Sequence, residues 1–448
     1  MTISSEISGT TRRHSDIQPS FSVTSFQKQI KGIVTMASKS TSRVENSALS
    51  AELAELLSVV EPGAIADLVI QRAFTHGATD VHMDSVPAGM RIRFRIDGLL
   101  HDIVPVPSDK ASNIISRLKV LANMDITDRR LPQDGRISST HIDGVDRDVR
   151  VGTMSTIYGE RIVMRMMPDP SEFSDLQSLG MYEDQFGQVE NLLKAPYGLV
   201  LVVGPVGAGK TTTLYNFVAS LNKPDRSIVT IEDPVERRLP GAAQIQVDNK
   251  SGLTFPVALR GVLRQDPNVM CIGEIRDAET ARIACRAATT GVLVLSTLHA
   301  NDTSSAVDVL RQFGIPSMLI ADSLRGVISQ RLIHRICEES RNEFAPDETS
   351  RKLLQLPPDD ASSKIVEGVP ADCNFQTGYA GRTAIFETMI VGRNLREAIN
   401  GDAPAFAILD AALADGMISL EESARRRVLD QTTSIEELKR IMVDSSMA

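Results

Sequence analysis

Hydrophobic and polar positions follow one pattern in the first half of this chain and another in its middle. In the first half, DVHMD (80–84) and MRIRFRIDG (90–98) alternate apolar and polar residues as half-buried strands do. Asp97-Gly98 supplies a hairpin turn after the second segment. Helical spacing covers 50–60, 64–75 and about 109–123, and strand-like segments continue through 136–166. These segments predict a mixed α+β domain, which we expect to end at the proline-rich acidic segment 168–175.

Unbroken apolar runs, separated by helical stretches, dominate the middle of the chain. They are LVLVVG (199–204), SIVTIED (227–233), NVMCIGE (268–274) and VLVLSTLH (292–299). A strand that is apolar at successive positions is covered on both faces, as the parallel strands of α/β domains are. The middle of the chain is therefore predicted to be an α/β domain with a buried parallel sheet.

Both ends of the chain carry weaker signals. Residues 1 to about 48 are crowded with Ser and Thr, and we expect them to be mostly disordered, with a short docking helix near Phe26–Met36. Beyond about 335 we expect a small irregular module, followed by helices near 403–414 and 417–443.

The composition is that of a globular protein, with 42% hydrophobic and 23% charged residues among 448. No apolar run approaches the roughly 18 residues that a membrane-spanning helix needs, and no secretory signal is visible. We therefore expect a cytoplasmic protein whose membrane contact is peripheral. A formal net charge of -9 argues against general affinity for nucleic acid.

The clearest chemical signal is GPVGAGKTT, which fits the phosphate-binding pattern G-x-x-x-x-G-K-[ST] between an apolar strand and a helix. Its glycines let backbone N–H groups wrap a β-phosphate, and the helix N-terminus adds partial positive charge. Lys210 is expected to reach the β- and γ-phosphates of ATP, and the Thr211 hydroxyl to bind Mg²⁺. The expected nucleotide ligands here are Gly204, Pro205, Val206, Gly207, Ala208, Gly209, Lys210, Thr211 and Thr212.

An ATPase also needs a group that activates water, and the apolar run VMCIGE ends in Glu274. Gly273 stands where an Asp would commonly hold Mg²⁺, so we expect the metal to bind through Thr211, water and the phosphates. Glu274 is then the candidate general base. The alternative is that Glu274 caps the helix that starts near Asp277.

Two further apolar runs also end in polar residues. IEDPVE (231–236) carries the carboxylates of Glu232, Asp233 and Glu236, which can order water and Mg²⁺ or bind arginines. The alternative interpretation is a charged loop exposed to solvent, which would have the same composition. STLHAND (296–302) places His299 where a γ-phosphate sensor would lie, and a purely structural histidine fits equally well.

Four arginines are candidates for neutralising the charge that develops in phosphoryl transfer. Arg260 and Arg264 lie four residues apart on one helix face, and Arg150 and Arg165 lie on strand-like segments of the earlier domain. Spacing alone leaves a surface position as the default interpretation of each.

Over about residues 64–445 the chain resembles the type II secretion and type IV pilus assembly ATPase family. The resemblance rests on four motifs: Walker A GPVGAGKTTTLY (204–215), the aspartate box TIEDPVE (230–236), Walker B within GLTFPVALRGVLRQDPNVMCIGEIRDAETA (252–281), and the histidine box GVLVLSTLHANDTSSAV (291–307). RIRFRIDG (91–98), RRLPQDGRIS (129–138) and YGERIVMRMM (158–167) resemble the family's smaller second domain.

The resemblance implies an α/β fold: a RecA-like P-loop ATPase core, preceded by a smaller PAS-like α+β domain and followed by a small C-terminal helical module. We expect a disordered segment at 1–48, the PAS-like domain at 49–172, the core at 176–334 and the C-terminal module at 335–448. The resemblance also implies a homo-hexamer with ATP near the seam between domains.

Roles for single residues follow from the same resemblance. Glu274 would be the catalytic glutamate, and His299 would sense or support the site. Glu232, Asp233 and Glu236 would belong to the site. Arg150, Arg165, Arg260 and Arg264 would act on the phosphates or couple the domains.

The sequence departs from the family pattern after the core, where assembly-type members commonly carry a zinc module of two C-x₂-C pairs. Here one cysteine of each pair remains, Cys337 and Cys373, and His334 would still leave a tetrahedral site one ligand short. We therefore expect no zinc. The segment TGYAGRTAIFE (377–387) still resembles that module, which favours a role in assembly over retraction.

The expected function is ATP hydrolysis with Mg²⁺ that drives assembly of a type IV pilus or a type II secretion pseudopilus, with an inner-membrane platform protein as partner. Alternatives are a pilus retraction ATPase, a nucleic-acid motor on the same core and a nucleotide-gated scaffold without turnover. The acidic balance and an aromatic content of 4% count against the nucleic-acid motor. Intact Lys210 and Glu274 count against the scaffold.

Overall fold

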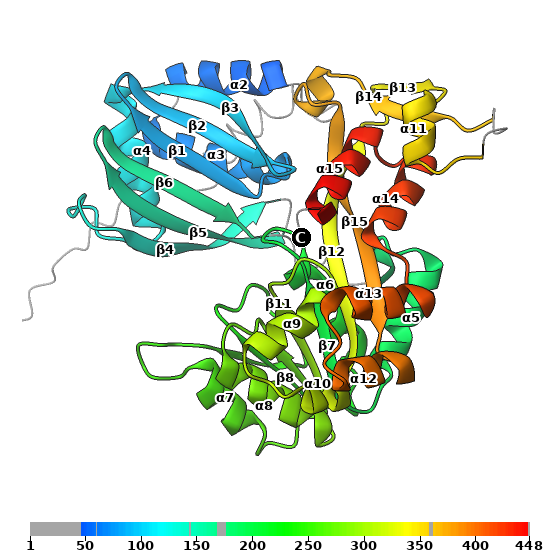
Figure 1. The fold of residues 1–448 in the computed structure, drawn as a ribbon. Helices are drawn as coiled ribbons and strands as arrows, with labels where there is room; N and C mark the ends of the chain where they lie inside the picture. The colour runs from blue at the N-terminus through cyan, green and yellow to red at the C-terminus, as the bar shows by residue number, and fades with distance from the viewer. Residues whose placement is uncertain (1–45, 60, 143–144, 168–175, 358–361, 447–448) are drawn as a thin grey trace, which may run out of the picture. The chain divides into compact units, whose positions relative to one another are not determined.

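The computed structural model describes residues 46–59, 61–142, 145–167, 176–357 and 362–446 (Figure 1). Residues 1–45, with the docking helix expected near Phe26–Met36, lie outside the described residues, as does the boundary segment expected at 168–175.

The first half of the described chain forms a six-stranded antiparallel sheet with the strand order β3-β2-β1-β6-β5-β4. Its strands are β1 (Asp80–Val86), β2 (Gly89–Ile96), β3 (Leu99–Pro107), β4 (Gln133–Ile142), β5 (Val145–Thr156) and β6 (Gly159–Met166). The alternation predicted for β2 is confirmed, because Met90, Ile92, Phe94 and Ile96 are buried. Asp97, with a φ of 52°, makes the turn into β3.

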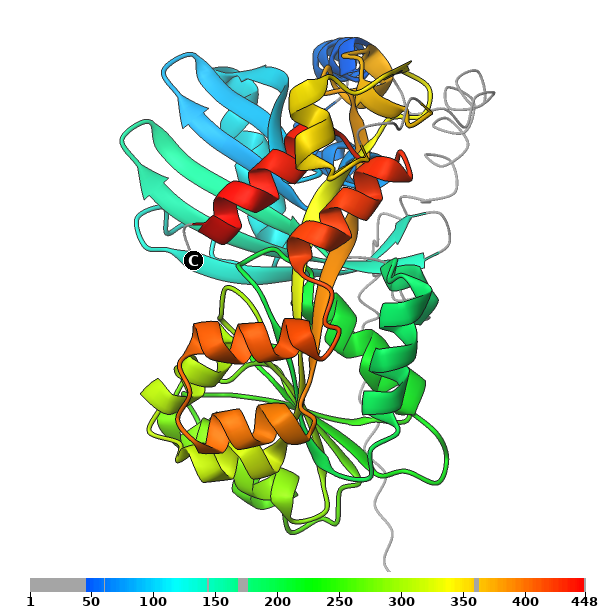
Figure 2. The ribbon, with the colours of Figure 1, turned by 45° about the vertical axis from the view of Figure 1, so that its right-hand side comes forward.

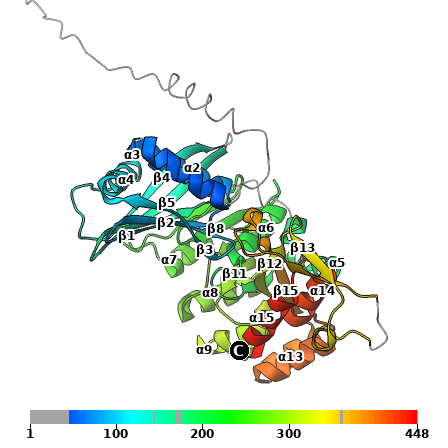
Figure 3. The same cartoon turned by 90° about the horizontal axis from the view of Figure 1, so that it is seen from above.

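Three helices pack against the core of this sheet (Figure 3). They are α2 (Asn46–Val59), α3 (Pro62–Thr75) and α4 (Ser108–Leu121), close to the ranges predicted from helical spacing. Their apolar faces bury Leu53, Ile70 and Ile114 against strand residues such as Phe94 and Met164. The mixture of helices and antiparallel strands predicted from the sequence for this part of the chain is confirmed.

A second sheet of seven strands has the order β15-β12-β7-β11-β10-β8-β9. Its strands are β7 (Gly198–Val203), β8 (Ile228–Glu232), β9 (Ala243–Gln246), β10 (Val269–Ile272), β11 (Leu293–Leu298), β12 (Leu324–Ile336) and β15 (Tyr379–Ile390). All neighbouring pairs are parallel except β12 with β15. Each of the four apolar runs singled out in the sequence forms one of the parallel strands.

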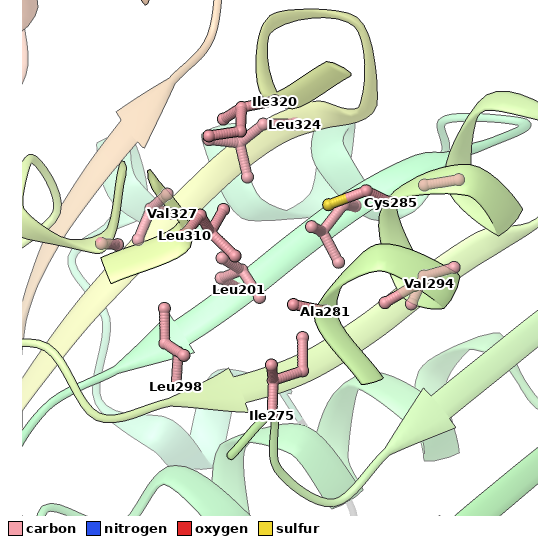
Figure 4. Packing of buried hydrophobic residues seen from close by; sticks show 14 of the residues in the cluster. Leu201, Ile275, Ala281, Cys285, Val294, Leu298, Leu310, Ile320, Leu324 and Val327 are labelled. Carbon is pink, nitrogen blue, oxygen red and sulfur yellow. The ribbon is translucent and has the colours of Figure 1, made fainter. Parts of the chain in front are cut away.

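Helices cover both faces of the seven-stranded sheet, which explains why β7 is apolar at successive positions. Leu199, Leu201 and Val203 face one cluster of apolar side chains, and Val200 and Val202 face the other. The first cluster (Figure 4) includes residues of α7 (Phe255–Val262), α8 (Ala278–Thr289), α9 (Ser305–Gln312), α10 (Ser317–Ser323), α12 (Arg393–Asn400) and α13 (Ala405–Ala414). The second includes residues of η1 (Leu176–Leu179), α5 (Glu183–Leu193) and α6 (Lys210–Leu221). The parallel strand ends that carry the expected site therefore sit on a core buried on both sides.

The C-terminal part of the chain contributes to the core sheet as well as forming its own small cluster. β12 runs through the boundary expected at 334/335, and β15 pairs with it as an edge strand. Between these two strands in the sequence lie β13 (Arg341–Phe344), α11 (Glu348–Leu353), β14 (Ile365–Gly368) and η2 (Asp372–Asn374), and α14 (Leu420–Leu429) and α15 (Ile435–Ser446) follow β15. Figure 2 shows α14 and α15, orange-red and red, beside the two long strands, where Ile333 and Ile385 pack against Val428 and Leu438. The expected domain division stays a prediction, with one sheet extending across its last boundary.

None of the helices in the described ranges is both long and apolar enough to span a lipid bilayer.

Candidate active site

The loop between β7 and α6 has the backbone shape that the glycine pattern predicts. Gly204 has a φ of 146° and Gly209 a φ of 85°, both in the region that favours glycine. A Cβ atom on Gly204 would lie 2.5 Å from the carbonyl oxygen of Gln330, and one on Gly209 would lie 2.8 Å from Gln330 Nε2. Gln330 of β12 therefore supports the loop from behind, and its Oε1 also accepts a hydrogen bond from Thr213 at 2.6 Å.

A cavity of about 840 Å³ opens in front of this loop. It is lined by the loop and the first turn of α6, by the ends of β8, β10 and β11, and by residues of the smaller domain. Most of the predicted site residues share it, namely Val206, Gly207, Ala208, Gly209, Lys210, Thr211, Thr212, Glu232, Asp233, Glu236, Glu274, His299 and Arg165. Of the remaining loop residues, Gly204 and Pro205 contribute backbone carbonyls to Lys210 instead.

The ammonium group of Lys210 is held over the loop. Its Nζ donates to the carbonyl oxygens of Gly204 at 2.7 Å and Pro205 at 3.0 Å. Burial lowers the pKa of Lys210, and the nearby carboxylate of Glu274 opposes that shift. The buried cation is thus poised at the position where phosphate oxygens would compensate its charge.

Glu274 extends from the end of β10 into the cavity with 19% of its side chain exposed. One carboxylate oxygen forms an ion pair with Arg276, and the other lies 3.5 Å from Nε2 of His299. The alternative role of helix cap belongs to Asp277, whose side chain accepts a hydrogen bond from the Thr280 N–H at 2.8 Å. Glu274 is therefore free to face the cavity, with two basic side chains orienting its carboxylate.

The three carboxylates of the segment 231–236 have different surroundings. Glu232 is 6% exposed, and its carboxylate accepts hydrogen bonds from Tyr215, Thr230 and Gln244. Because these bonds engage both of its oxygens, Glu232 positions the segment, although it also lines the cavity.

Asp233 and Glu236 are closer to charged partners. Asp233 Oδ2 lies 3.8 Å from Arg276, which links it to Glu274. Burial raises the pKa of Glu236, and the positive charges of Arg150 and Arg165 oppose that shift. The acidic segment is therefore the place where arginines of the smaller domain come near the nucleotide loop.

The four predicted arginines occupy different places. Arg165 lines the cavity and donates to Asp80 at 3.4 Å. Arg150 does not line it, but its Nη2 donates to the Val235 carbonyl oxygen at 3.0 Å. Arg260 and Arg264 are exposed around the end of α7 and do not line the cavity. Arg260 pairs with Glu279, and Arg264 donates to the carbonyl oxygen of Arg260 at 2.6 Å.

Three further arginines belong to the site and were not identified from the sequence. Arg95 and Arg382 line the cavity, and Arg276 joins Glu274 to Asp233. Arg276 could have been found from its position two residues after the candidate base. Arg95 and Arg382 come from strands of different sheets, so only the folded arrangement identifies them.

The oxygen groups at the cavity suit a hard divalent cation, because the Thr211 hydroxyl and the carboxylates of Asp233 and Glu274 all line it. Across the described ranges, His, Cys, Asp and Glu side chains form no group of three or more that could hold a metal ion by themselves. These residues therefore fit a cation such as Mg²⁺ that would be bound jointly by the loop, by water and by the phosphates.

Comparison with known proteins agrees with this arrangement. The chain is 40% identical to the type II secretion system protein HxcR of Pseudomonas aeruginosa, over 88% of this chain and 81% of that protein. It is 41% identical to the type II secretion system ATPase E of Vibrio cholerae, over 84% and 74%. The type IV pilus assembly ATPase PilB of Thermus thermophilus is 38% identical, with 83% of this chain matched to 42% of that longer protein.

Solved structures show the same fold at lower identity. The Legionella pneumophila ATPase DotB superposes with a TM-score of 0.64 at 19% identity, covering 86% of this chain and 96% of that one. The pilus retraction motor PilT with bound ADP gives 0.59 at 23%, covering 85% and 98%. The fold class predicted from the sequence is thereby confirmed. The family described as type II/IV secretion system protein matches residues 58–440, so this chain belongs to that family.

Proposed function

We propose that this chain is an ATP-hydrolysing motor, working as a homo-hexamer, that powers assembly of a type IV pilus or a type II secretion pseudopilus. The observation that carries the proposal is the single cavity onto which the phosphate-binding loop, Lys210 and Glu274 all open. The names of relatives near 40% identity, among them a type II secretion system ATPase, support the same function.

Phosphate binding is the part of the mechanism assigned to the loop and α6. Lys210 exchanges the two carbonyl oxygens that it now contacts for oxygens of the β- and γ-phosphates. The first turn of α6 directs free N–H groups and the positive end of its dipole at the same phosphates. Gly207 and Gly209 both have positive φ angles, the backbone conformation in which a glycine-rich loop can wrap a phosphate.

Water activation is assigned to Glu274. Its carboxylate accepts a proton from the attacking water, and contacts with Arg276 and His299 fix the direction of its oxygens. Mg²⁺, held by Thr211 with water and phosphates, would neutralise charge on the phosphate oxygens. Arg165, which lines the cavity, and Arg150, beside Glu236, supply further positive charge from the smaller domain.

Partner and location follow from the function proposed. A motor for pilus or pseudopilus assembly acts at the cytoplasmic side of the inner membrane, and we infer that it reaches the membrane peripherally through a platform protein. The acidic net charge of -9 favours a protein partner over nucleic acid. Because the fold is also similar to that of PilT, a pilus retraction motor, retraction of a pilus remains the alternative function.

The test measures phosphate release and nucleotide binding by wild type and by Lys210→Ala, with Lys223→Ala as the control. Lys223 is exposed just after α6 and does not line the cavity, so that variant keeps both activities. Lys210→Ala loses both, because the phosphates lose their buried cation. Tight ATP binding by Lys210→Ala would contradict the role of Lys210, and nucleic-acid-stimulated turnover of wild type would support the rival motor.

A further inference from the structure

The four cysteines of the chain fall into two chemically different pairs. Cys271 in β10 and Cys285 in α8 are completely or almost completely buried. Burial raises the pKa of the Cys271 thiol well above its ordinary value and that of Cys285 to about 11. Both thiols therefore remain protonated and shielded at neutral pH, as structural cysteines do.

Cys337 and Cys373 are 36 residues apart in the sequence, yet their Sγ atoms lie 3.9 Å from each other. Cys337 directly follows β12, and Cys373 is the middle residue of the short helix η2. The backbone N–H of Cys337 donates to the carbonyl oxygen of Gly378 at 3.1 Å, which fixes the end of β12 against the segment after η2. This backbone hydrogen bond holds Cys337 close to the segment that carries Cys373.

Asn374 keeps the turn that carries Cys373 in place. Its side-chain oxygen accepts hydrogen bonds from the N–H groups of Ala371, Thr377 and Gly378 at 3.0 to 3.1 Å. Its Nδ2 donates to the Ser340 hydroxyl at 2.6 Å, on the Cys337 side. Ser340 and Asn374 thus form a polar bridge beside the two sulfur atoms.

The two thiols differ in exposure and acidity. Cys337 is 4% exposed, whereas Cys373 is partly exposed. Partial burial opposes ionisation of Cys337, but hydrogen bonds from Ser340 and the Glu339 backbone outweigh it and lower the pKa of that thiol. Burial and the neighbouring Cys337 raise the pKa of Cys373. The more acidic thiol is therefore the less exposed one, and it lies 3.9 Å from the sulfur of an accessible partner that it can attack once that partner carries a mixed disulfide.

We propose that Cys337 and Cys373 are a reversible disulfide-forming pair that fastens the end of β12 to η2. The partly exposed Cys373 first exchanges with a small disulfide oxidant such as oxidised glutathione, which gives a mixed disulfide and releases one glutathione thiol. The Cys337 thiolate then attacks the Cys373 sulfur and expels the second glutathione thiolate, which takes up a proton. Two protein thiols are oxidised, one glutathione disulfide is reduced to two thiols, and the protein gains one S–S bond.

Closing the bond requires the sulfur atoms to approach from 3.9 Å to about 2.05 Å. The consequence extends to the smaller domain. Phe375, two residues after Cys373, packs in its core, and the Phe375 ring centroid lies 5.0 Å from that of His101. The disulfide thereby joins the strand behind the nucleotide loop to the turn that anchors Phe375. This proposal does not depend on the proposed function.

The test uses the full chain, equilibrated without metal at a series of ratios of reduced to oxidised glutathione. Free thiols are counted after denaturation, and peptides are identified by mass spectrometry without reduction. We expect the count to fall from four to two, with Cys337 and Cys373 in one linked peptide pair and full recovery of thiols on adding a dithiol reductant. The melting temperature of the oxidised form should be higher, because the link restricts the unfolded chain.

Variants separate this assignment from non-specific oxidation. Cys285→Ser, the control, should still form the link, with a count falling from three to one. Cys337→Ser should stop at the mixed disulfide, with one glutathione bound to Cys373. A count that stays at four, a link that contains Cys271 or Cys285, or a disulfide between two chains would each overturn the proposal.

Discussion

The phenol of Tyr215 donates a hydrogen bond to the buried carboxylate of Glu232, and its oxygen accepts bonds from the N–H groups of Glu236 and Arg237 at 3.2 and 3.1 Å. Tyr215 belongs to α6, which begins at Lys210, whereas Glu232 and Glu236 belong to the acidic segment and Arg237 follows it directly. Burial and the Glu232 carboxylate raise the pKa of Tyr215, so the phenol stays protonated. One side chain thus joins the phosphate-binding helix to the acidic segment.

Tyr215→Phe should lower the free energy of unfolding by about 1–3 kcal/mol, since it leaves the buried Glu232 carboxylate with one partner fewer. It should also lower kcat, because the acidic segment loses its connection to α6. Urea unfolding and steady-state ATPase kinetics measure the two effects. Tyr158→Phe is the control, as Tyr158 is 56% exposed in a hairpin turn. If both variants match wild type, the Tyr215 contact has no role in positioning.

Glu274→Gln should bind ATP normally and turn it over at least about a hundredfold more slowly, the usual contribution of a general base. The amide keeps the shape of the side chain but cannot accept the proton of the attacking water. Single-turnover kinetics and a binding isotherm separate these effects. Glu279→Gln, which alters the exposed partner of Arg260, serves as the matched control. Wild-type turnover in Glu274→Gln would exclude it as the base.

Replacing Arg150 or Arg165 with Ala should lower turnover more than ATP affinity, because such an arginine would neutralise charge that develops on the γ-phosphate during the reaction. An arginine in this role can raise the rate by about 10³-fold. Arg165 lines the cavity, and Arg150 contacts the acidic segment through Val235. Arg264→Ala is the control, because Arg264 is exposed and does not line the cavity.

Specific activity should rise with protein concentration until the hexamer is saturated, as mass action requires. The rate per subunit is measured across a dilution series, beside molecular mass by light scattering. Concentration-independent activity in a sample shown to be monomeric would remove the need for a hexamer.

Purified, metal-replete protein should contain no stoichiometric zinc, since Cys337 and Cys373 supply two thiolates where a structural site needs four ligands. Elemental analysis measures the zinc content. Cys337→Ser under reducing conditions should leave the melting temperature nearly unchanged, because we expect Cys337 not to bind zinc. If Cys337 were a structural zinc ligand, the substitution would disrupt the module. One zinc per chain would refute this prediction.

Stability should depend on pH through His334 and Glu437, whose side chains lie 3.2 Å apart. The hydrogen bond to Glu437 raises the pKa of His334 above its ordinary 6.5, and that of Glu437 falls to about 2, because hydrogen bonds from His334 and Arg440 outweigh the effect of burial. The histidine contribution is complete below about pH 6.5 and is lost as pH rises through the raised pKa. The Glu437 contribution is lost only as pH falls below about 4.5.

The melting temperature of wild type should therefore fall more between pH 6 and pH 9 than that of His334→Gln. Glu437→Gln should show the same reduced dependence, since it removes the partner that raises the histidine pKa. Parallel pH profiles for wild type and both variants would show that the pair makes no net contribution.

Local sequence signals were enough to predict the glycine-rich loop between β7 and α6 and its backbone shape. The spacing of Gly204, Gly209 and Lys210 between an apolar strand and a helix is specific to a phosphate-binding loop. Glu274 was identifiable for a similar reason, because it ends a buried strand of the same sheet. In each case the information lies within about a dozen neighbouring residues.

Features that depend on distant contacts could not be predicted in this way. β15 was expected to belong to an irregular module, because its partner β12 lies more than 40 positions earlier and its residues pair antiparallel at a sheet edge. Arg95 and Arg382 reach the cavity from two different sheets, and no local pattern distinguishes them from surface arginines. The surroundings of Glu232 likewise depend on Tyr215 and Gln244, from separate elements.

β12 is a stiff strand that connects the nucleotide loop to the hairpin turn of the smaller domain. At Gln330 it contacts the nucleotide loop, and at His334 its side chain contacts the Asp97 carbonyl oxygen at 2.9 Å, in the hairpin turn of the smaller domain. An extended strand rises about 3.3 Å per residue, so these contacts are about 13 Å apart along it. β15 pairs with β12 at every residue from Gln330 to His334, so this part of the strand resists stretching and compression. A displacement of the nucleotide loop along β12 would therefore be transmitted to the hairpin turn with little loss, because the strand between them would move as a rigid unit.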